Sequence, residues 1–456
     1  MLVRWLVYTG IAWLAYVVKE SHLVQNLPFH LFPPDLPAQF AHLPHAASSG
    51  APLEAFTARS DPSLAPAGRL AYCEDAGALW VVDALGNEGD NTHKVELEWA
   101  ALERGEVEFH PLGLALVPPV DGDDDSGVRL FVVNHGAAQS TVEVFSLSST
   151  TSSPPHRLAH RATHLLTVSH PSLSLAPNSI APLSRTSFFV SHDHRHTSRS
   201  RSLVGRLANW LETVCALPYG RVDDVWFGEL DGAGAGRAGA EVCTTTVVEG
   251  VSFANGLALS PEQDTLVVAS TTRREVLFYN VRPSSSSSSS SHADASPTLT
   301  LRRTVSLPML VDNLSLLPSS PNSTSLTLLA AGHPSYPALL SAAHGLNLRL
   351  RLPGPLREWA STLGAQDWVE WDVRLRADEQ RGMSWVVAVQ DPPVVDGGAK
   401  EHEWETVYQS SGRIDEGGFG GSTTAVAGGG SCAGGQERAW MAVVGLYEEG
   451  VRIVRQ

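Results

Sequence analysis

Short apolar runs, many rich in β-branched residues, recur along most of the chain and are separated by turn-forming residues. Four segments share one order: a polar or small residue pair, an apolar run, a turn containing Pro, Asp or Gly, and a second β-branched run. They begin at Gly113, Asn178, Asn255 and Asp312. Short runs broken by turns are typical of strands in a compact β-structure rather than of helices. The pattern therefore predicts an all-β fold.

The spacing of these segments indicates a propeller with insertions. They begin about 60 to 80 residues apart, which is wider than the ~40–50 residues of a minimal four-stranded blade. We expect surface loops near residues 192–202, 284–296 and 417–436, which are rich in His, Arg and Ser, in Ser, and in Gly respectively. Such segments bury too little apolar surface to fold alone. The last strand-like runs are suited to closing the ring, so we predict a β-propeller over residues 61–456.

Two segments interrupt the β pattern with helical signals. The uncharged run WLVYTGIAWLAYVV follows Arg4 and ends before Lys19, and no small-residue cleavage site follows it closely. It predicts a hydrophobic helix within residues 1–26 that anchors the protein to a membrane of the secretory pathway or cell surface, with a signal-peptide core as the alternative. We expect residues 27–60 to be a Pro-rich linker. Residues 201–217 place apolar side chains near helical spacing and predict an amphipathic helix over one face.

Composition removes some classes of function. Hydrophobic residues make up 43% of the chain and charged residues 18%, which suits a large core. The formal net charge of −16 argues against a nucleic-acid partner, because such a partner requires a basic face. The four cysteines show no CxxC spacing and are isolated thiols or form at most one or two bridges: Cys73, Cys215, Cys243 and Cys432.

Polar residues at the starts of the predicted inner strands carry the candidate chemistry. Asn178, Asn255 and the pair Asp312 and Asn313 each precede an apolar run. Inner strands of a propeller begin near the central channel, so these oxygens should converge, and Glu74 would add a second carboxylate. Ligation by oxygen alone suits Ca²⁺, which accepts six to eight oxygens in flexible geometry. The alternative is that each asparagine only shapes a turn.

Several motifs occur in an order that resembles the paraoxonase/arylesterase family of calcium-dependent lactonases and arylesterases. They are Cys73-Glu74-Asp75, Leu130 to His135 with Ser140 to Phe145, Phe253-Ala254-Asn255-Gly256, and Leu310-Val311-Asp312-Asn313. The resemblance runs from about Glu74 to the C-terminus and implies a six-bladed β-propeller with a calcium ion in its central channel.

Residue by residue, the resemblance implies two metal sites. Five residues fall where the family binds its catalytic calcium: Glu74, Asn178, Asn255, Asp312 and Asn313. Asp75 and the backbone of Leu114 fall at a second, structural calcium. His135 matches one member of the family's histidine dyad, and Asp193-His194 matches an Asp-His pair near the active site.

The chain also departs from the family. Leu112 stands where the family has its water-activating histidine, and His110 lies two residues earlier. Ser179 replaces an aspartate ligand of the second calcium, and the positions of the family's disulfide carry no cysteine. A gluconolactonase-like or strictosidine-synthase-like propeller is a further alternative, which the Asp312-Asn313 pair and the Phe253 motif disfavour.

The resulting hypothesis is a calcium-dependent hydrolase of lactones or aryl esters, in which Asp312, His110 or His135 takes the proton of the attacking water. The rival hypothesis is a non-catalytic, membrane-tethered propeller whose calcium only fixes the register of the blades.

Three other motifs have plainer interpretations. Residues 121–127 lack the glutamate of a calcium loop and predict a hairpin turn. His192, His194 and His196 alternate like zinc ligands, but the Arg/Ser-rich continuation favours an exposed loop. The sequons at Asn313 and Asn322 predict a glycoprotein modified at Asn322.

Overall fold

The computed structural model describes residues 77–82, 92–119, 127–136, 139–151, 158–197, 202–228, 241–283, 296–317, 326–334, 383–394, 402–410, 419–431, 437–445 and 451–455. Strands dominate these residues, and the helices among them are α3 (Ala100–Glu103) and α4 (Leu203–Val214). The all-β prediction is confirmed. The predicted anchor and linker, residues 1–60, lie outside the described residues.

The strands form four antiparallel blades and two smaller sheets. The first blade holds β4 (Pro111–Val117), β5 (Val128–His135), β6 (Ser140–Thr151) and β7 (Leu158–Val168), with β3 (Glu96–Glu98) parallel to β7. The second holds β8 (Pro177–Pro182), β9 (Ser187–His192), β10 (Gly220–Phe227) and β11 (Val242–Val251). The third holds β12 (Ala254–Leu259), β13 (Thr265–Ser270), β14 (Glu275–Arg282) and β15 (Thr298–Ser306). The fourth holds β16 (Leu310–Leu316), β17 (Leu326–His333), β18 (Ser384–Val394) and β19 (His402–Ser410).

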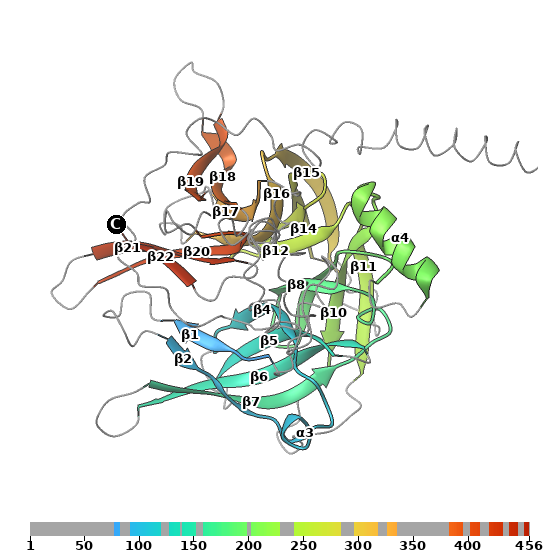
Figure 1. Cartoon of the computed structure of the whole chain (residues 1–456), viewed down its shortest axis with the longest axis vertical. Helices are drawn as coiled ribbons and strands as arrows, with labels where there is room; N and C mark the ends of the chain where they lie inside the picture. The colour runs from blue at the N-terminus through green and yellow to red at the C-terminus, as the bar shows by residue number, and fades with distance from the viewer. Residues whose placement is uncertain are drawn as a thin grey trace, which may run out of the picture.

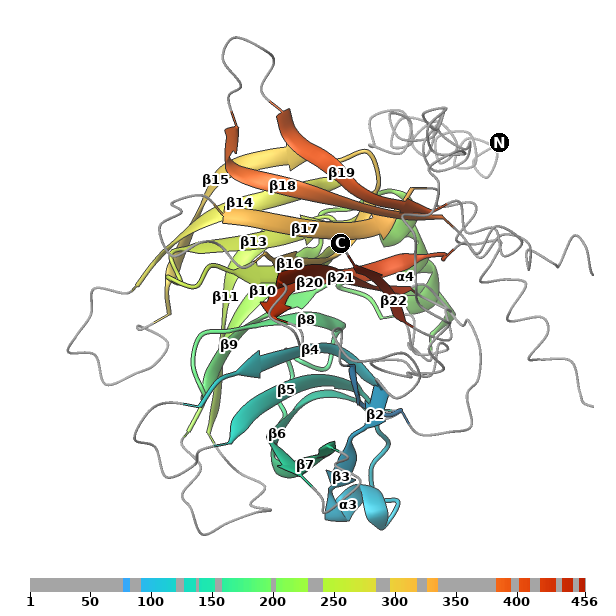
Figure 2. The ribbon, with the colours of Figure 1, turned by 90° about the vertical axis from the view of Figure 1, so that its left-hand side faces the viewer.

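The two smaller sheets flank this series. One pairs β1 (Trp80–Val82) with β2 (Thr92–Lys94), and the other holds β20 (Ser422–Ser431), β21 (Glu437–Gly445) and β22 (Val451–Arg455). The innermost strands pack side by side in the order β4, β8, β12, β16 and β20. Figure 1 looks onto this arrangement, and Figure 2 shows the four blades following one another from β4–β7 to β16–β19. The described residues therefore form a propeller-like fold.

The hydrophobic core lies between the blades. The second strand of each blade is apolar on both faces; β13, for example, is buried at every residue. One apolar cluster joins the first and second blades, another the second and third, and a third the third and fourth. Outer strands such as β15 expose most of their side chains. Continuous apolar runs in the sequence thus mark second strands, because these strands have a neighbouring blade on each side.

A repeated irregularity opens each inner strand. The register with the second strand shifts between Pro111 and Leu114 in β4 and between Pro177 and Ile180 in β8. It shifts again between Ala254 and Leu257 in β12 and between Val311 and Leu314 in β16. Two residues in each strand are thereby left out of the regular pairing. Bulges of this kind re-aim side chains and are common next to active sites.

Helix α4 confirms the predicted amphipathic helix, and its polar side is the packed one. Asn209 and Glu212 are buried, and Glu212 accepts hydrogen bonds from the backbone N–H groups of Arg195 and His196. Its apolar side chains are exposed: Leu203, Val204, Leu207 and Trp210. No helix within the described ranges is long and apolar enough to span a membrane.

Candidate functional site

The residues left out of the pairing at the strand starts include the predicted metal ligands. The first position of each bulge holds Leu112, Asn178, Asn255 and Asp312, and the second holds Gly113, Ser179, Gly256 and Asn313. Asn178, Asn255 and Asp312 therefore occupy equivalent places in three successive blades whose inner strands are neighbours. A backbone irregularity shared by the blades places these groups at one end of the inner strands.

Two glycines allow the neighbouring strand starts to approach closely. A Cβ on Gly113 would lie 2.1 Å from the carbonyl oxygen of Asn178. A Cβ on Gly256 would lie 2.6 Å from the Cα of Asn313 and 2.7 Å from the carbonyl oxygen of Asp312. Any side chain at these positions would push the candidate ligands away, so the glycines set the spacing between strands.

Each asparagine donates a hydrogen bond through its amide nitrogen. Asn178 Nδ2 donates to Asp193 Oδ2 over 3.4 Å, and Asn255 Nδ2 donates to Thr271 Oγ1 over 3.2 Å. Asn313 Nδ2 donates to Asp312 Oδ1 over 3.2 Å. The carbonyl oxygen Asn255 Oδ1 is buried and has no hydrogen-bond partner among the described residues. A buried acceptor without a donor is unfavourable, and a cation would satisfy it.

The remaining predicted ligands are placed less fully. Glu74 and Asp75 lie outside the described residues. Leu114 lies in β4 with 43% of its surface exposed. Ser179, at the position of the second-site ligand, uses its hydroxyl to accept a hydrogen bond from the backbone N–H of Leu257.

His333 adds a residue that the sequence analysis did not identify. Its Nε2 lies 3.2 Å from Asp312 Oδ2, and its side chain is 6% exposed. It ends β17, just as His135 ends β5 and His192 ends β9. The sequence did contain a signal for His333, because three apolar second strands end in a histidine that lies beside the start of an inner strand.

The two histidines proposed as bases belong to the first blade. His135 Nε2 lies 2.9 Å from the carbonyl oxygen of Pro177, so it donates there, and Nδ1 is left to accept from Ser140 Oγ at 3.5 Å. His110 Nε2 lies 3.5 Å from the carboxylate of Glu108. In the described part of the chain, no hydrogen bond or ion pair joins either ring to Asp312. His135 therefore braces the residue that precedes Asn178.

A polar chain runs from Asn178 to helix α4. Asp193 Oδ1 lies 2.9 Å from His194 Nδ1, and His194 Nε2 lies 2.6 Å from Thr213 Oγ1. Burial disfavours the charged form of His194, but attraction to Asp193, their hydrogen bond and the more distant Glu212 outweigh it, and the pKa of His194 is raised. The ring of Phe253 packs edge-on against the ring of His194, with 4.6 Å between the ring centroids.

The predicted exposed loop beginning at His192 is wrong for its first residues, since His192, Asp193 and His194 are buried. His192 pairs with Asp223 at 3.1 Å, and His196 pairs with Glu212 at 3.2 Å. The three histidines thus face different partners. Among the described residues, no group of three or more His, Cys, Asp or Glu side chains is arranged to hold a metal. This segment contacts carboxylates on β10 and α4.

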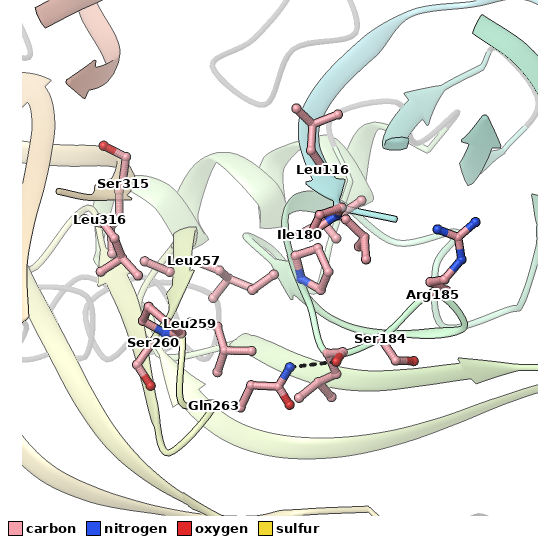
Figure 3. Close-up of a pocket in the computed structure, with 18 of the residues that line it drawn as sticks. Leu116, Ile180, Ser184, Arg185, Leu257, Leu259, Ser260, Gln263, Ser315 and Leu316 are labelled. Atoms are coloured by element: carbon pink, nitrogen blue, oxygen red, sulfur yellow. Dashed lines mark hydrogen bonds between the residues drawn. The ribbon is translucent and has the colours of Figure 1, made fainter. Parts of the chain in front are cut away.

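A cavity of about 710 Å³ lies along the same inner strands, after their bulges (Figure 3). Leu116, Ile180, Leu257 and Leu316 line it, and each follows the bulge of its strand. None of Asn178, Asn255, Asp312 and Asn313 lines it.

The family model for arylesterase matches residues 70–343, which is more than half of the chain. The chain belongs to the arylesterase family. It is 27% identical over 234 residues to serum paraoxonase/arylesterase 2 of Rattus norvegicus, covering 50% of this chain and 53% of that protein. It is 28% identical over 212 residues to the human protein of the same name, covering 46% of this chain and 47% of that protein.

The chain thus spans about half the length of these curated relatives. Among solved structures, it resembles a putative 6-phosphogluconolactonase from Bacteroides uniformis. That likeness has a TM-score of 0.30 at 11% identity and covers 82% of this chain and 77% of the other.

This arylesterase-family chain carries an apolar residue at one of the four equivalent bulge positions. Leu112 is partly buried and packs against the cluster between the first and second blades. A hydrocarbon side chain can neither accept nor donate a proton. The polar site is therefore built by the second, third and fourth blades.

Proposed function

We propose that the protein is a calcium-dependent hydrolase of lactones or aryl esters, built on a six-bladed propeller. The observation that carries the proposal is the shared bulge, which sets Asn178, Asn255 and the pair Asp312-Asn313 at equivalent places in three neighbouring blades. Membership of the arylesterase family supports ester or lactone hydrolysis as the reaction class.

The donor set fits a hard cation. The described ligands supply amide oxygens and one carboxylate, and Asn255 Oδ1 is a buried oxygen that no described residue donates to. In the proposal, Glu74 adds a second carboxylate, which would balance the charge of Ca²⁺. When bound, calcium would stabilise the negative charge that develops on the substrate carbonyl oxygen. We expect the ion to be held without nitrogen or sulfur ligands.

The chain's own residues would orient the carboxylate that receives the water proton. Asn313 Nδ2 donates to Asp312 Oδ1, and His333 Nε2 faces Asp312 Oδ2. These two contacts fix the plane of the carboxylate. We assign the base to Asp312, with His333 holding it in place. His135 supports Pro177 and hence Asn178, and Leu112 takes no part in proton transfer.

One assay tests the proposal. Purified protein is offered a panel of lactones and aryl acetates before chelation, after chelation, and after calcium is returned. The expected result is hydrolysis that chelation removes and calcium restores. Asn255→Ala should lose both bound calcium and turnover. Thr271→Val, which removes only the partner of Asn255 Nδ2, is the matched control and should retain both.

Two outcomes contradict different parts of the proposal. Hydrolysis that survives complete chelation would refute the metal. Bound calcium without hydrolysis of any lactone or ester would instead favour the non-catalytic scaffold, to which the apolar Leu112 already gives some support.

We further propose that residues 1–26 anchor the protein to a membrane, since the run after Arg4 is uncharged. Deleting these residues should release folded protein from the membrane fraction. Native protein that begins near residue 20 and is freely secreted would contradict this.

A further inference from the structure

The strand-start bulges leave backbone groups without their usual partners, and two serine hydroxyls serve them at one blade junction. Ser191 Oγ accepts a hydrogen bond from Ser179 N at 3.0 Å and donates to the carbonyl oxygen of Asn255 at 2.6 Å. Ser179 Oγ accepts from Leu257 N at 3.1 Å. Ser191 is fully buried and Ser179 is 8% exposed. The second and third blades are thus joined by hydroxyls next to a candidate metal ligand.

The second bulge position faces the next inner strand in other blades too. Gly113 lies against Asn178 and Ser179, and Gly256 lies against Asp312 and Asn313. In both cases glycine allows direct backbone approach. In the second blade this position is Ser179, whose side-chain oxygen accepts a hydrogen bond from the N–H of Leu257 in the next inner strand.

The same use of hydroxyls recurs after the fourth blade. Ser422 Oγ accepts from Trp385 N at 3.1 Å and donates to the carbonyl oxygen of Gly332 at 2.8 Å. A hydroxyl can accept a hydrogen bond from an N–H and donate one to a C=O at the same time, whereas a cation can bind only the C=O oxygen. At these two junctions, serine hydroxyls satisfy buried backbone groups where the ladder is interrupted.

We propose that the Ser179 hydroxyl, which with Ser191 joins the second and third blades, does not serve the second calcium ion implied by the family resemblance, so that the chain holds a single calcium. Ser179 brings no negative charge to that position, and its oxygen already accepts the Leu257 N–H. The count of one ion rests on the proposed function, whereas the hydroxyl link does not.

The test measures calcium content and thermal unfolding of the full-length protein. The expected calcium content is one ion per chain, and two ions would overturn the inference. Ser179→Ala should leave that content unchanged and lower the Tm by a few degrees, equally with calcium and with chelator. A calcium ligand at Ser179 would instead make Ser179→Ala lose an ion and shift the Tm only when calcium is present.

Control variants distinguish loss of the hydroxyl link from nonspecific destabilisation of the fold. Ser191→Ala should lower the Tm similarly, and the double variant should lose less than the sum, because both serines belong to one network. Ser184→Ala, on an exposed loop, should change the Tm little. If Ser179→Ala does not fold, Ser179→Thr is used instead, because it keeps a hydroxyl. Ser179→Thr should unfold near the parent Tm. A fall in its Tm that occurs only when calcium is present would refute the link. A chain that holds no calcium would refute the proposed cofactor but not the hydroxyl link.

Discussion

Replacing Gly256 with alanine tests whether strand spacing controls the candidate metal site. The new Cβ would lie 2.6 Å from the Cα of Asn313 and from the backbone N of Leu314. Ordinary contact begins at 3.4 Å, so the two strands must separate by about 0.8 Å. Calcium–oxygen distances span only about 0.3 Å, from 2.3 to 2.6 Å. The strain therefore falls on the pair Asp312-Asn313.

We expect Gly256→Ala to destabilise the fold by about 1–3 kcal/mol, the usual cost of overpacking. Calcium affinity should fall by about 10–100-fold, the scale seen when the supports of metal ligands are disturbed. Urea unfolding and calcium titration of the same preparation measure the two effects. Gly228→Ala is the matched control, because a Cβ there meets nothing within 4 Å. It should be neutral or slightly stabilising.

One result would refute this reasoning. If Gly256→Ala unfolds at the parent's urea concentration and binds calcium as tightly as the parent, then the approach of β12 to β16 does not set the geometry of the site.

Three further predictions concern the polar network. Measured at saturating calcium, Asp312→Asn should lower turnover by about 10²–10⁴-fold, whereas His135→Gln should keep most activity. An Asp312→Asn protein that is active under these conditions would remove Asp312 from the chemistry. Leu112→His should raise aryl-ester turnover if the channel accepts a second base there, and unchanged kinetics would show that this bulge does not face the substrate. The pKa of His194 is raised in the folded state, so its stabilising pairing with Asp193 is fully present below about pH 6.5 and is lost as pH rises through the folded pKa. Urea unfolding of His194→Gln across that range should show a flatter pH dependence than the parent, and equal slopes would contradict the assignment.

The sequence predicted the fold class and the strand starts because those features are local. Apolar runs broken by turns identify second strands such as β13, and the asparagines stand beside them. The bulge could not be predicted from the sequence, because it is a mismatch in residue number between two paired strands rather than a property of either strand. For the same reason Gly113 and Gly256 gave no signal as spacers.

Burial of polar side chains was the harder feature to predict. The Arg and Ser residues after His196 indicated an exposed loop, yet His192 and His194 are buried. The partner of His192 is Asp223 on another strand, β10. The contact between His194 and its neighbour Asp193 depends on the backbone conformation after β9. His333 was missed because its partner Asp312 lies 21 residues earlier, across the register of β16 and β17.

The bulge at each inner strand has a consequence for how the protein can change over evolution. Its first residue stands outside the regular hydrogen-bond register, so that side chain can be exchanged without breaking the ladder that holds a blade together, whereas the second residue is fixed by the neighbouring strand. Leu112 illustrates such an exchange, since an apolar residue occupies a place that is polar in three sister strands. Substitutions that change the chemistry of the site can therefore occur without disturbing the packing between blades that keeps the chain folded. We expect new specificities to arise at the first bulge position at little cost in stability.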